Sequence, residues 1–264
     1  MEKKNRVVIV TGGTSGIGRA LAEKFVAKGD TVVVLSRSAT DNGKNSFSCD
    51  VADSARVKEV FRTVIDNFGG IDILINNAGY GQSGALEFIS EDAVNKIIDV
   101  NLRGVVNCTR SALAFMKPGG KIVNISSAAA FVPMPFRTMY SVTKSAVNMF
   151  SKGMAMELYG TGIQITALCL GDVQTDFANH RVIESETSFR YGNRIKRVDD
   201  FVSSRSNEKK ASLQSTVNKL EKEIEKKKFK DVRIIGAKWK FVSVVVRMLP
   251  DGAATSIVKR IFRG

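Results

Sequence analysis

Short apolar runs alternate with amphipathic helical patterns along most of the chain. Residues 6–11 (RVVIVT) form an apolar run of the kind found in strands buried on both faces of a sheet. Residues 16–28 follow with Ile17, Leu21 and Phe25 on one helical face, and Gly29 ends the pattern. Right-handed crossovers turn such an alternation into a parallel sheet. The pattern therefore predicts an α/β fold, doubly wound, with seven parallel strands and helices on both faces.

The same patterns define the other expected elements. The strands are expected at residues 31–35, 46–51, 71–75, 121–125, 163–170 and 231–236. The helices are expected at residues 54–68, within 91–116, at 138–159 and at 207–228. The link 38–48 leaves little room for a helix. Because no internal repeat or low-complexity linker interrupts the chain, we expect residues 1–264 to form a single domain.

The net charge of +14 is concentrated in the last third of the chain. Residues 181–264 hold 21 Lys+Arg against 10 Asp+Glu, whereas residues 1–180 hold 19 against 16. A solvated face and a basic tail at residues 237–264 explain this best. An anionic substrate or weak contact with an anionic membrane surface comes second, and nucleic acid third. No nucleic-acid partner is expected.

The sequence also favours a cytoplasmic protein. Its first residues lack the pattern of a secretory signal, and no apolar run reaches the roughly 18 residues of a membrane span. Cys49, Cys108 and Cys169 are odd in number and widely separated, which does not indicate a disulfide framework. The single histidine, His180, has no cluster of metal ligands near it in the sequence, so no metal site is expected.

A glycine-rich loop joins the first strand to the first helix. It reads TGGTSGIG and spaces Gly12, Gly16 and Gly18 as G-x-x-x-G-x-G. Glycines at such a junction let the backbone turn sharply and approach a pyrophosphate at the positive end of the following helix. The loop predicts a dinucleotide site, with Thr14, Ser15 and Ile17 among the expected contacts.

The end of the second strand indicates which dinucleotide binds. NAD sites place an acidic residue there to accept the ribose hydroxyls. This chain has Ser36 and Arg37 instead, and a guanidinium offers a planar fork of donors that suits a 2′-phosphate. An exposed arginine at a strand end is common by itself. Together with the missing acid, however, it favours NADP(H), with Ser36 and Arg37 as contacts.

A tyrosine and a lysine lie one helical turn apart at Tyr140 and Lys144, on one face of the helix. A free tyrosine has a pKa near 10, and a neighbouring cation is expected to lower it. Tyr140 can then exchange a proton with a substrate oxygen while hydride moves. Ser127, at the carboxyl end of its strand, can hold the same oxygen. Ser126 is the alternative, and the 13-residue spacing to Tyr140 favours Ser127.

The order TGGTSGIG, NNAG, IVNISS and YSVTK resembles the short-chain dehydrogenase/reductase family, in its single-domain branch, over residues 5–176. The resemblance implies a Rossmann-type fold and a catalytic tetrad of Asn101, Ser127, Tyr140 and Lys144. It implies that Asn101 holds a water in a proton relay, and that Lys144 bonds the nicotinamide ribose. It also implies a homo-dimer or tetramer that pairs through the helices near 101–116 and 138–159. Further cofactor contacts that it implies are Asp50, Val51, Asn77, Ala78, Gly79, Gly171, Val173 and Thr175.

The chain departs from the family at Leu170, where proline is usual, so the geometry of that turn is left open. In relatives, the segment corresponding to residues 177–206 forms a lid over the substrate. Here it carries the apolar side chains Phe177, Phe189, Tyr191, Ile195 and Phe201 among several arginines. They either clasp an apolar ring system or tuck onto the core from an exposed loop. Phe131, Met134 and Met139 form a second apolar wall or pack in the core.

The tail is similar to those of the hydroxysteroid, retinol and acyl-lipid branches of the family. The resulting hypothesis is an NADPH-dependent enzyme that interconverts a bulky hydrophobic alcohol and its ketone, such as a steroid or bile acid. The alternatives are a retinoid, an acyl-lipid ketone, a 3-oxoacyl thioester or a small carbonyl compound. A non-catalytic NADP-binding regulator is the further alternative, which the intact tetrad disfavours.

Overall fold

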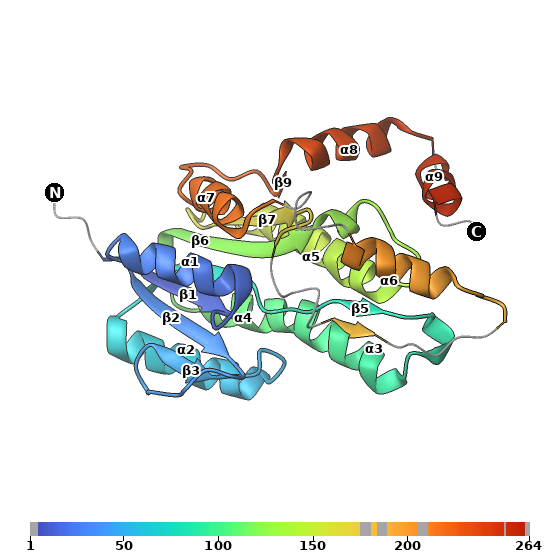
Figure 1. Cartoon of the computed structure of the whole chain (residues 1–264). Coiled ribbons are helices and arrows are strands. Elements are labelled where there is room, and N and C mark those ends of the chain that lie inside the picture. The colour runs from blue at the N-terminus through green and yellow to red at the C-terminus, as the bar shows by residue number, and fades with distance from the viewer. Residues whose placement is uncertain (1–4, 175–180, 184–188, 205–210, 251, 262–264) are drawn as a thin grey trace.

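Seven parallel strands form the central sheet of the described part, in the order β3-β2-β1-β4-β6-β7-β9 (Figure 1). The structure is a computed structural model and describes residues 5–174, 181–183, 189–204, 211–250 and 252–261. The strands are β1 (Val7–Thr11), β2 (Thr31–Ser36), β3 (Ser46–Ser48), β4 (Ile71–Asn76), β6 (Met116–Ser127), β7 (Gln164–Leu170) and β9 (Val232–Ile234). Every neighbouring pair is parallel, which confirms the predicted Rossmann-type sheet.

Helices cover both faces of this sheet. α1 (Gly16–Ala27) and α7 (Leu213–Ile224) pack on one face, and α2 (Ser54–Phe68), α4 (Gly104–Leu113) and α5 (Thr138–Glu157) pack on the other. Alternate residues of β1 point to opposite sides, so that Val7 and Ile9 join one apolar core while Val8 and Val10 join the other. Burial on both faces explains why this strand is apolar throughout.

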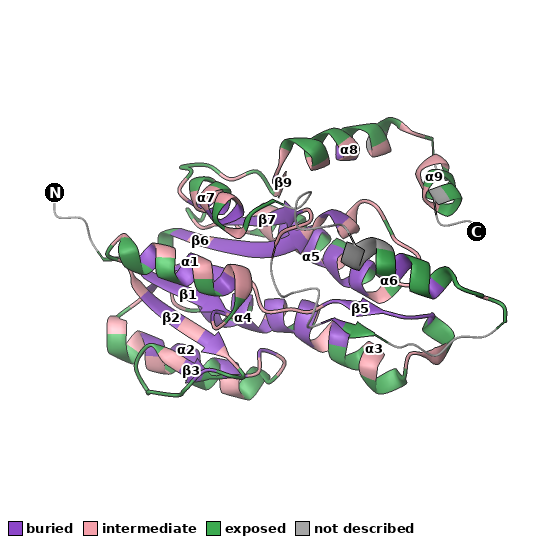
Figure 2. Cartoon of the chain, in the orientation of Figure 1, coloured by how far each residue is buried: buried purple, intermediate pink, exposed green. Residues whose placement is uncertain are grey.

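Smaller elements follow the central strands. The helical ones are α3 (Glu91–Ile98), the π-helical turn η2 (Asp99–Arg103), the 3₁₀ turns η1 (Leu86–Phe88) and η3 (Ala128–Ala130), α6 (Arg194–Ser204), α8 (Ala237–Met248) and α9 (Ala253–Ile261). β5 (Gln82–Ser83) and β8 (Val182–Ile183) pair in a separate two-stranded sheet. α8 and α9 extend beyond the last strand and are largely exposed (Figure 2). None of the helices in the described ranges is long and apolar enough to span a bilayer.

Several boundaries differ from the sequence prediction. β3 ends at residue 48 rather than 51, and β9 covers residues 232–234 of the expected 231–236. The long helix expected within residues 91–116 is divided by the π turn η2 and ends at Leu113. β6 begins at residue 116 rather than 121. α7 begins at Leu213 because the Ser212 hydroxyl accepts a hydrogen bond from the amide of Ser215 and caps the helix there. The first part of the predicted helix, residues 207–210, lies outside the described residues. The link at 38–48 contains no helix, as expected.

An ion-pair network ties the start of β1 to the ends of α1 and α7. Arg6 bonds Asp30 at 2.7 Å and Glu225 at 2.9 Å, and Lys28 bonds Glu225 at 2.6 Å. The side chains of Arg6 and Glu225 are 27% and 30% exposed, so water only partly screens them. The hydrogen bond from Arg6, helped by Lys28, outweighs burial and lowers the pKa of Glu225 to about 2. The carboxylate therefore stabilises the fold in its charged form.

We predict that Glu225→Gln lowers the free energy of unfolding at pH 7 by about 1–2 kcal/mol. The Glu225 pKa falls on folding, so its contribution is complete above the ordinary value of 4.5 and disappears as the pH drops towards 2. Urea unfolding of both proteins between pH 7 and 2 measures the difference. Glu23→Gln, which removes an exposed pair with Arg19, is the control and should change stability by less than about 0.5 kcal/mol. An equal effect of both substitutions would contradict the assignment.

Candidate functional site

The predicted glycines of the β1–α1 turn are required for two reasons, backbone conformation and space. Gly12 and Gly16 have positive φ angles of 64° and 50°, which glycine adopts without strain. Gly18 is buried, and a Cβ there would lie 2.3 Å from the Gly12 carbonyl oxygen and 2.4 Å from Nδ2 of Asn77. No larger residue fits at that position without moving the loop. The turn thus brings its backbone within reach of a ligand at the start of α1.

The amino end of α1 offers amide groups to an anion. Ser15 precedes the helix with extended backbone angles and does not cap it with its side chain. The first turn, which includes Ile17, carries no acidic side chain that would offset the positive helix end. Asn77 donates from Nδ2 to the Thr11 carbonyl at 3.0 Å, and the Ala78 amide donates to the Thr11 hydroxyl at 3.0 Å. These bonds fix the loop against the end of β4, as a pyrophosphate site requires.

Hydroxyl groups gather beside Arg37 at the end of β2. Thr14 lies 2.9 Å from Ser36 and 3.0 Å from Ser38, oxygen to oxygen. Arg37 is exposed, and its charge opposes the rise that burial causes in the pKa of Tyr80. Ser38 was missed as a site residue, although it adjoins Arg37 in sequence. Three hydroxyls and a guanidinium form a donor set that suits a phosphate.

Asp50 and Val51 lie at the carboxyl end of β3. The Asp50 carboxylate accepts a hydrogen bond from the Ala52 amide at 3.0 Å. Val51 packs against α4 so closely that a Cβ on Gly104 would lie 2.5 Å from its Cγ2 atom. Both predicted contacts therefore lie on the same sheet edge as the glycine loop, on its β3 side.

Ser127, Tyr140 and Lys144 are close together. Ser127 ends β6, and its hydroxyl accepts a hydrogen bond from the Ala129 amide at 3.1 Å. Tyr140 and Lys144 are buried on α5, with the Lys144 ammonium 5.9 Å from the Tyr140 ring centroid. Lys144 also donates to the Ile125 carbonyl at 2.9 Å. The structure therefore groups the three predicted catalytic side chains at one sheet edge.

Burial controls the ionisation of these groups. It raises the pKa of Tyr140, and a hydrogen bond with Ser127 and the charge of Arg137 offset only part of that rise. Burial also lowers the pKa of Lys144 to about 8, so its own charge is easily lost. The expected net lowering of the Tyr140 pKa is therefore wrong for the chain by itself. Arg137, 4.9 Å from the tyrosine ring centroid, is a cation that sequence reasoning missed.

Asn101 lies in the π turn η2, and π turns are frequent at functional sites. Its side chain accepts from the Tyr80 amide at 3.0 Å and donates to the Thr143 hydroxyl at 3.3 Å. A Cβ on Gly79 would lie 2.9 Å from Asn101 Oδ1 and 3.6 Å from Lys144 Nζ. Glycine at 79 thus allows Asn101 and Lys144 to approach each other. The fourth predicted catalytic residue lies beside the other three.

The alternative serine has a different environment. Ser126 is buried and donates from its hydroxyl to the Lys144 carbonyl at 3.2 Å. This bond ties β6 to α5 and turns the hydroxyl towards the helix backbone. Ser127 is the serine that bonds Tyr140.

The segment after β7 follows the same sheet edge. Leu170, in place of the usual proline, continues the strand and pairs with Ser127. Val173 then forms a single bridge with Ala211. Gly171 touches Trp239 of α8, whose Nε1 would lie 1.8 Å from a Cβ on that glycine. Sequence reasoning did not single out Trp239. Thr175 lies outside the described residues.

The predicted lid is partly helical rather than an open loop. α6 buries Ile195 and Val198, and the ring of Tyr191 packs edge-on against Phe136 at 5.5 Å between centroids. Phe136 has a φ of 60°, a strained conformation for a residue with a side chain. Phe189 is 99% exposed. Phe177 and His180 lie outside the described residues, as does the side chain of Phe201. Phe131, Met134 and Met139 are half-buried.

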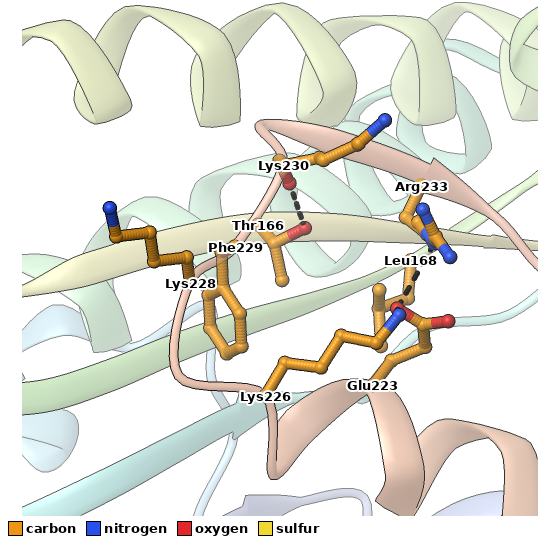
Figure 3. Close-up of a pocket in the computed structure, with 8 residues that line it drawn as sticks. All are labelled: Thr166, Leu168, Glu223, Lys226, Lys228, Phe229, Lys230 and Arg233. Atoms are coloured by element: carbon orange, nitrogen blue, oxygen red, sulfur yellow. Dashed lines mark hydrogen bonds and ion pairs between the residues drawn. The ribbon is translucent and has the colours of Figure 1, made fainter.

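A small cavity of about 120 Å³ lies elsewhere, between α7, β9 and the start of β7 (Figure 3). It is lined by Thr166, Leu168, Glu223, Lys226, Lys228, Phe229, Lys230 and Arg233. Glu223 bonds Lys226 at 2.6 Å and Arg233 at 3.0 Å. Thr166 belongs to the early part of β7, away from the end of that strand that pairs with Ser127. The cavity is therefore separate from the catalytic edge.

The three cysteines are core residues. Cys49, Cys108 and Cys169 are buried thiols that form no disulfide, and burial raises the pKa of Cys49 to about 11. The thiol is therefore the stable form of Cys49 at neutral pH. Among the described residues, no three His, Cys, Asp or Glu side chains are grouped so as to hold a metal ion.

Comparisons with known proteins agree with this architecture. The family model described as short chain dehydrogenase matches residues 6–185. The chain is 34% identical over 186 residues to a 3-ketodihydrosphingosine reductase from Bacteroides thetaiotaomicron, covering 69% of each chain. It is 35% identical over 192 residues to a 3alpha-hydroxysteroid dehydrogenase from Mediterraneibacter gnavus, covering 67% of this chain and 77% of that one.

Among solved structures, a short-chain dehydrogenase from Streptomyces avermitilis superposes with a TM-score of 0.83 at 26% identity, covering 99% of this chain and 96% of that one. The chain therefore belongs to the short-chain dehydrogenase/reductase family. It is an oxidoreductase of a family that binds nicotinamide cofactors.

Proposed function

We propose that this protein interconverts a secondary alcohol and a ketone with NADP(H), using Asn101, Ser127, Tyr140 and Lys144. The observation that carries the proposal is the grouping of these side chains at one sheet edge. Ser127 bonds Tyr140, Lys144 lies 5.9 Å from the tyrosine ring centroid, and Asn101 and Lys144 meet at Gly79. The glycine turn and the amino end of α1 lie at the carboxyl ends of the same parallel strands, where doubly wound sheets bind ligands.

In the direction of reduction, Tyr140 gives its phenolic proton to the substrate oxygen while Ser127 donates a hydrogen bond to that oxygen. When bound, NADPH supplies the hydride that the carbonyl carbon accepts. The Lys144 ammonium stabilises the phenolate that remains on Tyr140. Asn101, next to Lys144, holds a water through which a proton returns to the tyrosine. Because the phenol of Tyr140 is buried, this proton exchange is shielded from bulk solvent.

The residues at the end of β2 support NADP(H) over NAD(H). Arg37 and the hydroxyls of Thr14, Ser36 and Ser38 form the donor set described above, which suits a 2′-phosphate. The remaining cofactor contacts in the proposal are the glycine turn, Asp50 and Val51, residues 77–79, and Gly171, Val173 and Thr175.

A bulky hydrophobic substrate such as a steroid or bile acid is the substrate we propose. The similarity to a 3alpha-hydroxysteroid dehydrogenase supports it. The aromatic contact of Tyr191 with Phe136 supports an apolar lid. A second candidate is a long-chain ketone of lipid metabolism, which the similarity to a 3-ketodihydrosphingosine reductase favours. An NADPH-oxidation panel of steroid ketones, bile acids, retinal and 3-ketodihydrosphingosine separates these substrates.

The proposal includes one catalytic domain over residues 1–264, in the cytoplasm, assembled as a homo-dimer or tetramer. An exposed apolar stripe on α5 supports assembly: Val142, Met149 and Met156 recur at seven-residue spacing. Apolar side chains on one helix face favour a matching partner surface. Light scattering of the purified chain measures the number of subunits.

The outer face of α8 supports weak contact with an anionic membrane surface. Four exposed apolar side chains occupy positions i, i+3, i+4 and i+7 of the helix: Phe241, Val244, Val245 and Met248. The exposed lysines Lys238 and Lys240 flank this stripe. An apolar stripe bordered by cations matches the interface of an anionic bilayer, where the lysines meet lipid phosphates.

We predict that Tyr140→Phe lowers kcat by about 10²–10⁴-fold because the proton donor is lost. Binding of NADPH, measured by nicotinamide fluorescence, should change little. Tyr159→Phe removes the hydroxyl of a 91% exposed tyrosine and serves as the control, with turnover unchanged. Turnover of Tyr140→Phe close to that of the parent would exclude Tyr140 as the proton donor.

We predict that Arg37→Asp shifts the preference from NADPH towards NADH by at least about tenfold, because a charge-assisted bond to the 2′-phosphate is replaced by repulsion. The ratio of the two dissociation constants measures the shift. Arg62→Asp changes an arginine that contacts Phe115 instead, and controls for net charge. An unchanged ratio in Arg37→Asp would refute the phosphate contact.

We predict that the chain co-sediments with phosphatidylserine-containing vesicles, less so at high salt, and not with pure phosphatidylcholine vesicles. Phe241→Ser combined with Met248→Ser should weaken this binding by about tenfold, since two apolar side chains lose their burial. Val26→Ser, at another exposed apolar residue, is the control. Equal binding of the double variant and the parent would show that α8 is not the contact.

A further inference from the structure

Trp239 lies against the backbone next to the catalytic edge. It belongs to α8, which follows β9 after the turn at Gly236, whose φ is 96°. β9 pairs with β7 so that Ile234 is opposite Cys169, and the Ile235 amide donates to the Cys169 carbonyl at 2.9 Å. This register carries the start of α8 to the carboxyl end of β7. There the indole packs against Gly171. A Cβ built on this glycine would lie only 1.8 Å from Nε1 of Trp239.

The position of Gly171 places the indole near the reacting groups. Leu170, the residue before Gly171, pairs with Ser127. Asp172, the residue after it, is close enough to Tyr140 for its charge to raise the tyrosine pKa. Only glycine at 171 leaves space for the ring. An element beyond the last sheet strand therefore contributes a large aromatic surface to the end of β7.

The surroundings of Trp239 indicate what it meets. The indole is half-buried, while its neighbours Lys238 and Lys240 are exposed. An apolar ring beside a substrate oxygen site restricts the groups that reach this site by size. The apolar side chains on the outer face of α8 point elsewhere, since they are exposed. The two faces of α8 thus lie in different environments: Trp239 is half-buried on one, and the apolar side chains of the other are exposed to solvent.

We propose that Trp239 is a specificity-determining residue that forms a wall of the substrate site against Gly171 and limits the size of the ketone or alcohol that reaches Tyr140. This inference rests on the proposed function for the identity of the substrate. The contact of the indole with Gly171 does not depend on that function.

The position is tested by fluorescence, because Trp239 is the only tryptophan in the chain. NADP⁺ should lower the acrylamide quenching of its emission about twofold, since the nicotinamide half is expected to lie along Gly171 and Val173. Adenosine 2′,5′-bisphosphate fills only the end near Arg37 and should leave the quenching unchanged. Protection by both ligands, or by neither at saturation, would overturn the placement. This measurement requires neither turnover nor a variant.

The size limit is tested by Trp239→Ala. The ratio of kcat/KM for a 3-ketosteroid to that for 2-butanone should rise by about tenfold, because removing the ring opens space beside the substrate oxygen. Trp239→Phe should give an intermediate ratio and keep the helix packed. Phe241→Ala, on the exposed face of α8, should leave the ratio unchanged. A ratio for Trp239→Ala within twofold of the parent would overturn the size limit. A parent that turns over no ketone in the substrate panel refutes the proposed function instead, and the fluorescence result still decides where Trp239 lies.

Discussion

The arrangement of the site depends on the parallel register of four neighbouring strands, β1, β4, β6 and β7. Because these strands run in one direction, their carboxyl ends meet at one edge of the sheet. The glycine turn follows β1, Asn77 follows β4, Ser127 ends β6 and Gly171 follows β7. Each strand thus delivers a different part of the chemistry to the same place. α5 then lies across this edge and adds Tyr140 and Lys144, which are far from the glycine turn in sequence.

The predictable parts of this arrangement are those that depend on residues close together in the sequence. Residues 7–10 are apolar throughout because both faces of their strand are covered, and this pattern needs no knowledge of the partners. The spacing of Gly12, Gly16 and Gly18 predicts a sharp turn. Gly12 and Gly16 have positive φ angles, and Gly18 allows close approach of the Gly12 backbone. The one-turn spacing of Tyr140 and Lys144 places both on one helix face in any fold. These features depend on chain geometry over a few residues, so the sequence carries them directly.

The features that escaped prediction all depend on long-range register or on burial. Trp239 meets Gly171 because β9 pairs with β7 so that Ile234 is opposite Cys169, and the local pattern that predicts the strand does not fix this register. The π turn at Asn101 interrupts a continuous helical pattern, and the Asn101 side chain within it pairs with the backbone of Tyr80. The direction of the Tyr140 pKa was wrong because the desolvation of a buried phenol is a property of the packed fold.

That burial affects the protonation state of the candidate proton donor. A cation beside a solvated tyrosine favours the phenolate, which suits a base that removes a proton from an alcohol. In this site burial raises the pKa of Tyr140 and lowers that of Lys144 to about 8, so the neutral phenol is favoured at neutral pH. A neutral phenol is a proton donor, and a ketone that accepts hydride needs that proton. In the chain by itself, burial therefore keeps Tyr140 in the form that can donate a proton.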